Sequence, residues 1–266
     1  MIAARPMPDG ASGPPALALE GVTRSFGGFV AVNDVTISFP PGHIYGIIGP
    51  NGAGKTTLFN LLTGFLKPTR GRLRHRGEDV TRLSPAAIAR RGVVRSFQIT
   101  SIFANLSVAE NLALPVQIRA GEGSAFLRRS RWPRDHGAEI DAILDQVHIP
   151  AEWRARPAGA LPYGLKRSLE LGISLAARPE VLLLDEPTAG MAAQDIVRVT
   201  DLIGRIAAGR TVIVVEHNLG VIADLAHEIV VLQQGRVLAR GPYGEVQRDP
   251  RVIDAYLGTR GRRAGA

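Results

Sequence analysis

Short apolar runs that end in polar residues are the clearest pattern along this chain. They read HIYGIIGP at residues 43–50, VLLLDEP at 181–187 and TVIVVEHN at 211–218. Continuous apolar runs of this length are typical of strands buried on both faces of a parallel sheet. Ligands of open α/β sheets bind beyond the carboxyl ends of the strands, so we expect these three endings to meet at one site.

Helical patterns lie between these runs, at residues 56–65, 192–208 and 219–226, and together they predict an α/β core with a parallel sheet. Ahead of the core, LALEGVTRSF and AVNDVTISF flank the turn FGG. Their β-forming residues predict an antiparallel pair, which would form a separate β subdomain beside the main sheet.

The middle of the chain has a different character. Between residues 107 and 177 the spacing of apolar residues is helical, and Ser107 with Glu110 has the offset of a capping box. We therefore expect an inserted helical subdomain at about residues 99–177. After it, the pattern predicts a hairpin and two short helices before residue 258.

Composition sets the broad class. The chain has 266 residues and is 45% hydrophobic, which is enough for a substantial core. No apolar run approaches the roughly 18 residues of a membrane span. Residues 1–15 are predicted to be a disordered lead-in, residues 16–258 the folded domain and residues 259–266 a flexible basic tail. The absence of cysteine excludes disulfides and thiolate chemistry.

A formal net charge of +8 raises the possibility of a nucleic-acid partner. However, only Lys55, Lys67 and Lys166 among the 32 basic residues are lysine, so the charge reflects a general arginine bias. No basic motif interleaved with aromatic residues accompanies it. We expect no nucleic-acid partner.

The segment GPNGAGKTT fits the phosphate-binding pattern G-x-x-x-x-G-K-[ST] between a predicted strand and a predicted helix. Its glycines let backbone N–H groups turn toward phosphate oxygens, and the helix N-terminus adds positive potential. Lys55 is expected at the β- and γ-phosphates and the Thr56 hydroxyl on Mg²⁺. The alternative is a glycine-rich turn with an incidental lysine. The nucleotide-binding candidates are Gly49, Pro50, Asn51, Gly52, Ala53, Gly54, Lys55, Thr56 and Thr57.

Two acidic residues follow the second apolar run. Asp185 is placed to hold Mg²⁺ through water, and Glu186 to orient and deprotonate an attacking water. In the alternative interpretation, both residues only cap the next helix. A base aimed at water favours hydrolysis over transfer of phosphate to a second substrate, as in a small-molecule kinase.

From about residue 17 to 258, the chain resembles the ATPases of the ATP-binding-cassette (ABC) family. The resemblance rests on GPNGAGKTT, RSFQIT, LPYGLKRSLE, VLLLDEP and VEHN in this order. It implies that Phe26 stacks on adenine, that Gln98 links the metal and the attacking water to the helical subdomain, and that His217 bonds the γ-phosphate. Taken alone, Gln98 could be a surface amide and His217 a core histidine.

The segment LPYGLKRSLE stands where the family has its signature LSGGQ, which closes on the ATP of a second subunit. Pro162, Tyr163 and Leu165 replace serine, glycine and glutamine, while Gly164 remains free to approach phosphate. We expect a working signature without the hydroxyl, and a catalytically dead signature is the alternative. Ala192 also replaces an aspartate found in many relatives, at a contact between subunits.

The resemblance further implies two such chains in a head-to-tail dimer, Mg²⁺ and ATP as cofactors, and a cytoplasmic location, peripheral on the inner face of the membrane. Permease subunits would receive the motion near Gln98 and SIFANLSVAEN, and a solute-binding protein would act indirectly. The finer resemblance is to ATPases of branched-chain amino-acid importers, carried by FGGFVAVNDVTISF, RSFQITSIFANLSVAEN and DPRVIDAYLG. An importer of urea or another amide is one alternative. A soluble ABC-type factor outside transport is another.

Overall fold

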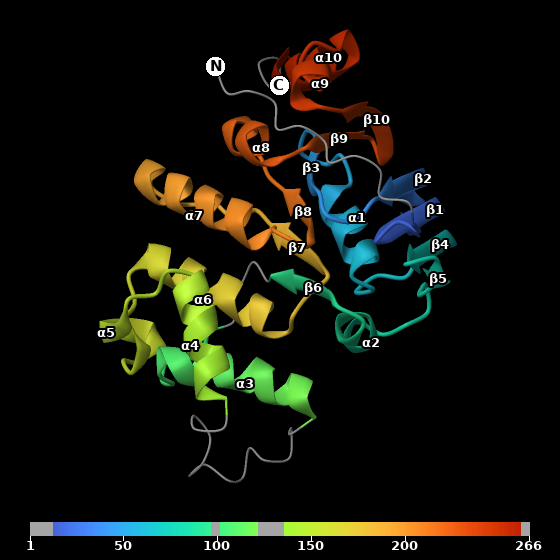
Figure 1. Ribbon diagram of the computed structural model, residues 1–266. Coiled ribbons are helices and arrows are strands. Elements are labelled where there is room, and N and C mark those ends of the chain that lie inside the picture. The colour runs from blue at the N-terminus through green and yellow to red at the C-terminus, as the bar shows by residue number, and fades with distance from the viewer. Residues whose placement is uncertain (1–12, 97–101, 122–135, 262–266) are drawn as a thin grey trace.

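The computed structural model describes residues 13–96, 102–121 and 136–261. At its centre is a six-stranded sheet of order β10-β9-β3-β8-β7-β6 (Figure 1). Its strands are β3 (Ile44–Ile48), β6 (Val93–Ser96), β7 (Val181–Asp185), β8 (Thr211–Val215), β9 (Glu228–Gln233) and β10 (Arg236–Gly241). The strands β3, β8 and β7 are parallel neighbours, so the predicted parallel α/β core is confirmed.

A second sheet, of order β2-β1-β4-β5, lies beside the first. Its strands are β1 (Leu17–Phe26), β2 (Phe29–Phe39), β4 (Arg70–His75) and β5 (Glu78–Asp79). The strands β1 and β2 are antiparallel, with Phe26 opposite Phe29 across the turn, which confirms the predicted pair. The strands β4 and β5 were not predicted from the sequence.

The helices alternate with the strands of the central sheet, as Figure 1 shows. They are α1 (Lys55–Leu62), α2 (Pro85–Arg90), α3 (Val108–Ala120), α4 (Gly137–Gln146), α5 (Ala151–Arg154), α6 (Tyr163–Ala176), α7 (Ala193–Ile206), α8 (Leu219–Leu225), α9 (Tyr243–Val246) and α10 (Pro250–Gly261), with a 3₁₀ turn η2 (Ala158–Ala160).

The central strands are buried on both faces. Along β7, Leu182 and Leu184 pack into one hydrophobic cluster with α6, α7 and α8, while Val181 and Leu183 pack into a second cluster with α1 and the β1–β2 sheet. Successive side chains of a strand point to opposite faces, so a continuous apolar run satisfies both clusters. This burial explains why the sequence pattern identified these strands.

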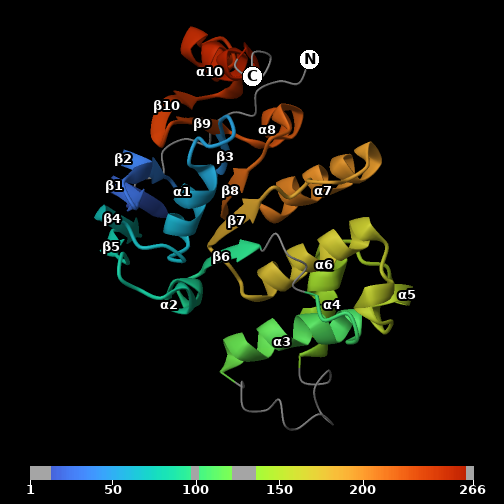
Figure 2. The same cartoon turned by 180° about the vertical axis from the view of Figure 1, so that it is seen from behind.

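Helices α3–α6, here called the helical lobe, lie to one side of the central sheet, away from β1 and β4 in both views (Figures 1 and 2). The predicted capping box is present, because the Ser107 hydroxyl accepts from the Glu110 N–H and the Glu110 carboxylate accepts from the Ser107 N–H. In the described parts of residues 102–176 there is no strand, only an isolated bridge between Ser107 and Pro157.

Some predicted features fall outside the described residues. Gln98 is one of them, as are residues 1–12 and 262–266 of the two predicted tails. The hairpin β9–β10 and the helices α9 and α10 match the predicted C-terminal pattern, and α10 continues to Gly261. Among the described helices, none is long and apolar enough to cross a lipid bilayer.

Candidate functional site

The glycine-rich segment connects β3 to α1, as its motif predicts. Gly54 precedes α1 with φ of 99°, and a Cβ there would lie 2.4 Å from the carbonyl oxygen of Ala31. A Cβ on Gly49 would lie 2.2 Å from the carbonyl oxygen of Leu232. Only glycine fits at these two positions, so the turn is held closely between β2 and β9.

A cavity of about 430 Å³ opens over this turn. It brings together Lys55, which follows β3, Glu186, which follows β7, and His217, which follows β8. The ends of these three parallel strands were predicted to converge. Of the nine candidates in the glycine-rich segment, seven line the cavity, while Gly49 and Pro50 do not. The other two predicted nucleotide-binding residues, Phe26 and Gly164, do not line it either. The lining residues are Phe29, Ala31, Asn51, Gly52, Ala53, Gly54, Lys55, Thr56, Thr57, Glu186 and His217.

Lys55 is buried at the floor of this turn. Its ammonium donates hydrogen bonds to the carbonyl oxygens of Gly49 at 2.7 Å and Pro50 at 3.0 Å. Burial lowers the pKa of Lys55, and the nearby Glu186 carboxylate opposes that shift. A buried cation with one acidic neighbour is suited to an anionic ligand.

Glu186 and His217 contact each other directly. The Nε2 atom of His217 lies 2.8 Å from Oε1 of Glu186. The backbone of Glu186 has φ of 46°, a left-handed conformation that costs an L-residue of order 1–3 kcal/mol. Its N–H donates to the carbonyl oxygen of Val215 at 2.8 Å, which holds this conformation against β8.

Asp185 is buried and paired with a residue that the sequence analysis did not single out. Arg95 of β6 donates to the Asp185 carboxylate at 2.6 Å and to the side-chain oxygen of Asn60 at 2.5 Å. Its guanidinium also lies 4.9 Å from the centre of the Phe59 ring. The signal in the sequence that could have indicated Arg95 is an arginine directly after two valines in VVRS, three positions before Gln98.

The donor chemistry of the site fits Mg²⁺. The Thr56 hydroxyl lines the cavity, and Asp185 immediately precedes Glu186, which also lines it. Magnesium binds through one or two protein oxygens together with phosphate and water. In the described residues no group of three or more His, Cys, Asp or Glu side chains could hold a metal ion.

The predicted aromatic platform has two candidates in the structure. Phe26, at the end of β1, is 42% exposed and carries the guanidinium of Arg24 4.5 Å from its ring centre. Phe29, opposite it across the turn, is 66% exposed and lines the cavity, whereas Phe26 does not. Phe29 was not predicted from the sequence, although it stands in the same FGGF turn.

The signature segment, residues 161–170, begins α6 and touches the turn after Glu186. The Arg167 guanidinium donates to the carbonyl oxygen of Pro187 at 3.0 Å, and the Tyr163 hydroxyl donates to that of Ala189 at 3.2 Å. Gly164 lies in the first turn of α6 and does not line the cavity over Lys55. Pro162 precedes the helix and supplies no side-chain cap.

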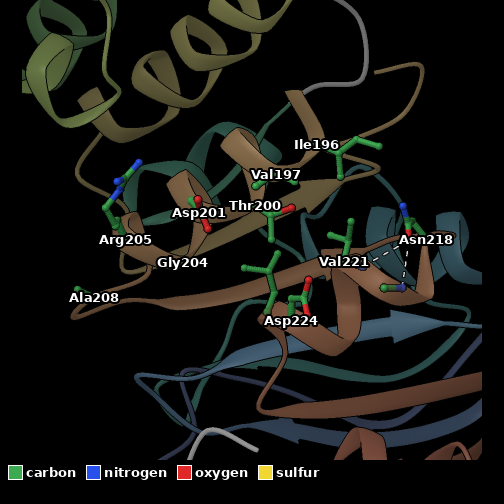
Figure 3. Close-up of a pocket in the computed structure, with 12 residues that line it drawn as sticks. Ile196, Val197, Thr200, Asp201, Gly204, Arg205, Ala208, Asn218, Val221 and Asp224 are labelled. Carbon is green, nitrogen blue, oxygen red and sulfur yellow. Dashed lines mark hydrogen bonds between the residues drawn. The ribbon is translucent and has the colours of Figure 1, made fainter. Parts of the chain in front are cut away.

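A larger cavity of about 870 Å³ lies between α7 and α8 (Figure 3). Asp201 and Thr200 of α7 line it from one side, and Asp224 and Val221 of α8 from the other. It shares no residue with the cavity over Lys55. The chemistry that the sequence predicts is therefore in the smaller cavity.

A phosphate-binding turn, a carboxylate and a histidine at the ends of neighbouring parallel strands define a nucleoside triphosphatase of the P-loop class. Residues 32–189 match the family described as ABC transporter, and residues 236–261 match the C-terminal segment of the branched-chain amino acid ATP-binding cassette transporter family. The chain belongs to the ABC transporter family, and it is an ATPase that binds ATP.

Two curated relatives illustrate the similarity. The high-affinity branched-chain amino acid transport ATP-binding protein BraF of Pseudomonas aeruginosa is 38% identical over 92% of this chain and 98% of its own length. The corresponding protein LivG of Escherichia coli K12 is 37% identical over the same shares. The ADP conformation of MJ1267, an ATP-binding cassette of an ABC transporter, superimposes with a TM-score of 0.80 at 31% identity, over 91% of this chain and 98% of that one.

Proposed function

We propose that this chain is the ATP-hydrolysing subunit of an importer for branched-chain or other hydrophobic amino acids. The observation that carries the proposal is the cavity shared by Lys55, Glu186 and His217, because it supplies a cation, a base and a hydrogen-bonding imidazole to one triphosphate. The names of the relatives and the match of residues 236–261 support the substrate class.

Within this site, Lys55 binds the β- and γ-phosphates, and Glu186 accepts a proton from the attacking water. His217, already hydrogen-bonded to Glu186, orients it and bonds the γ-phosphate. Phe26 or Phe29 provides the face on which adenine stacks. Thr56 and Asp185 would hold Mg²⁺, together with Gln98, which lies outside the described residues. When bound, Mg²⁺ neutralises the charge that develops on the phosphate oxygens.

A second copy or a homologous subunit completes the site. Gly164 and the N-terminus of α6 lie away from the cavity of their own chain, as expected of a segment that binds the ATP of a partner. The dimer would close on ATP and open after hydrolysis, and membrane-embedded permease subunits would receive this motion. The chain is then peripheral on the cytoplasmic face of the membrane, with a solute-binding protein acting through the permease.

The substitution Glu186→Gln tests this role. It keeps the shape of the side chain but removes the base, so we expect ATP turnover to fall at least about 100-fold. The variant should still bind ATP and should accumulate as an ATP-bound dimer, detected by light scattering after gel filtration. Turnover at the parent rate would exclude Glu186 as the base.

The substrate class is tested in cells. Deletion of the gene should lower the uptake of radiolabelled leucine, isoleucine and valine, and expression of the parent chain, but not of Glu186→Gln, should restore it. Uptake of a labelled sugar serves as the control. Purification of the tagged chain from detergent-solubilised membranes identifies the permease subunits. Unchanged amino-acid uptake, with uptake of urea or an amide lost instead, would contradict the proposed substrate.

A further inference from the structure

Glu216 stands between β8 and His217 and is only 4% exposed. None of the roles assigned above uses it. Its Oε1 atom accepts from the backbone N–H of Thr188 at 2.9 Å and from the Thr188 hydroxyl at 2.6 Å. Its Oε2 atom accepts from the backbone N–H groups of His217 at 3.0 Å and Asn218 at 3.3 Å. One buried carboxylate thus joins two loops.

These two loops carry the catalytic residues. Thr188 lies two positions after Glu186, and His217 directly follows Glu216. The ladder between β7 and β8 ends with Asp185 opposite Val215, and one more backbone hydrogen bond joins Glu186 to Val215. Beyond that bond, hydrogen bonds of Glu216 with Thr188 and of Glu186 with His217 join the two loops.

The chemistry of a carboxylate suits this place. Each of its oxygens accepts hydrogen bonds, and all four surrounding groups are donors. The same contact reaches further, because the Asn218 side chain caps α8 by accepting from Gly220 and Val221. Glu216 therefore ties the turn after β7 to the start of α8, with His217 between them.

We propose that Glu216 is a positioning residue for hydrolysis: it fixes the spacing between Glu186 and His217 by holding both of their loops. This inference rests on the proposed function of that pair. A misplacement of about 1 Å in a catalytic group can lower a rate about 100-fold. Lys55 lies in the glycine-rich turn between β3 and α1, which is separate from these two loops. Nucleotide binding should therefore depend on Glu216 far less than turnover does.

The variant Glu216→Gln separates these effects. One amide oxygen can still accept from Thr188, but the amide NH₂ then faces the N–H groups of His217 and Asn218, which lose their acceptor. The matched control is Glu228→Gln. Glu228 begins the nearby strand β9 and pairs with Arg240 at 2.6 Å, away from the cavity over Lys55.

The full-length chain and both variants are compared in three measurements: the turnover number for ATP, the dissociation constant for MgADP, and hydrogen exchange of backbone amides. For Glu216→Gln we expect turnover to fall about 10- to 100-fold, with MgADP affinity within about twofold of the parent. Exchange should accelerate at Thr188, His217 and Asn218 but not in the Lys55 turn. Glu228→Gln should match the parent in all three.

Turnover within twofold of the parent, or a loss of MgADP affinity as large as the loss of turnover, would overturn the proposal. If Glu216→Gln does not fold, Thr188→Val decides, since it removes only the hydroxyl donor; we expect turnover to fall several-fold, and unchanged turnover would overturn the proposal. The control Glu186→Gln keeps the two ideas apart. If Glu186→Gln is inactive and Glu216→Gln is fully active, the proposed function stands and the inference about Glu216 is overturned. If the parent chain itself has no ATPase activity, the proposed function is overturned, and hydrogen exchange still tests whether Glu216 holds the two loops.

Discussion

At the scale of single residues, Arg95 shows how an unpredicted side chain supports a predicted one. Arg95 and Asp185 are 13% and 4% exposed, and the guanidinium is shared between Asp185, Asn60 and the ring of Phe59. A carboxylate this deeply buried needs a partner, because an isolated buried charge is strongly unfavourable. The residue expected to hold Mg²⁺ is therefore held in place by Arg95.

We expect Arg95→Ala to lower the free energy of unfolding by about 3–5 kcal/mol, because it leaves Asp185 buried without its partner. Urea denaturation without nucleotide or Mg²⁺ measures the change. The control is Arg74→Ala, which breaks the more exposed pair with Glu20 and should lower the free energy of unfolding far less. Adding Asp185→Asn to Arg95→Ala should recover part of the loss. Equal losses for the two arginines would contradict this account.

At the scale of elements, the signature helix α6 begins without a side-chain cap. Pro162 has φ of −55° and ψ of 153°, a conformation that serine also adopts at an N-cap. The structure adds a constraint on Gly164 that the sequence did not reveal. A Cβ there would lie 2.9 Å from Oδ1 of Asp195 in α7. Any larger residue at this position would therefore require the Asp195 carboxylate to shift.

We predict that Pro162→Ser retains ATPase activity within about twofold, since a serine can cap the helix in place of the proline. Gly164→Asp should lower activity at least about tenfold, because like charges placed together cost several kcal/mol. Steady-state ATPase assays measure both. The double variant Gly164→Asp/Asp195→Ala distinguishes the two causes. Restored activity in the double variant would assign the loss to Asp195 and contradict a role of Gly164 at the nucleotide.

The elements that the sequence predicted are those with a strong local signal. The strands β3, β7 and β8 are buried on both faces, and the phosphate-binding turn has backbone positions that only glycine can occupy. The strand β6 was missed because it has only four residues and contains Arg95, whose partners are distant in sequence. Glu216 and Phe29 were missed for a related reason. Glu216 contacts Thr188 in another loop, and Phe29 lines a cavity together with the turn that contains Lys55, and the order of residues reveals neither relation.

At the scale of the whole molecule, the nucleotide turn is held by segments from most of the chain. Gly54 approaches β2, and Gly49 approaches β9. Tyr256 of α10 forms a hydrogen bond with the backbone of Gly49. Burial raises the pKa of Tyr256, and this hydrogen bond opposes the shift. A ligand bound to this turn therefore contacts a structure assembled from both ends of the sequence. Such a ligand should stabilise the entire fold.

We expect MgADP at 100 times its dissociation constant to add about 2.7 kcal/mol of stability, which corresponds to roughly 5–10 °C in melting temperature for a chain of this size. Lys55→Ala should lose most of that shift at the same MgADP concentration, because the buried cation is absent. Differential scanning calorimetry with and without MgADP measures it. Lys67→Ala, a lysine outside the cavity, should keep the full shift. Loss of the shift in both variants would indicate a general effect of lysine removal.

The contacts of α6 with Pro187 and Ala189 have a mechanical consequence. Both carbonyl groups belong to the turn that immediately follows Glu186, and Arg167 and Tyr163 are fixed to the first helical turns of the lobe. A rotation of the lobe must either break these two hydrogen bonds or pull on that turn. In the proposed dimer, a displacement of α6 by the neighbouring subunit would therefore be transmitted through these two hydrogen bonds to Glu186, the proposed base, of the same chain.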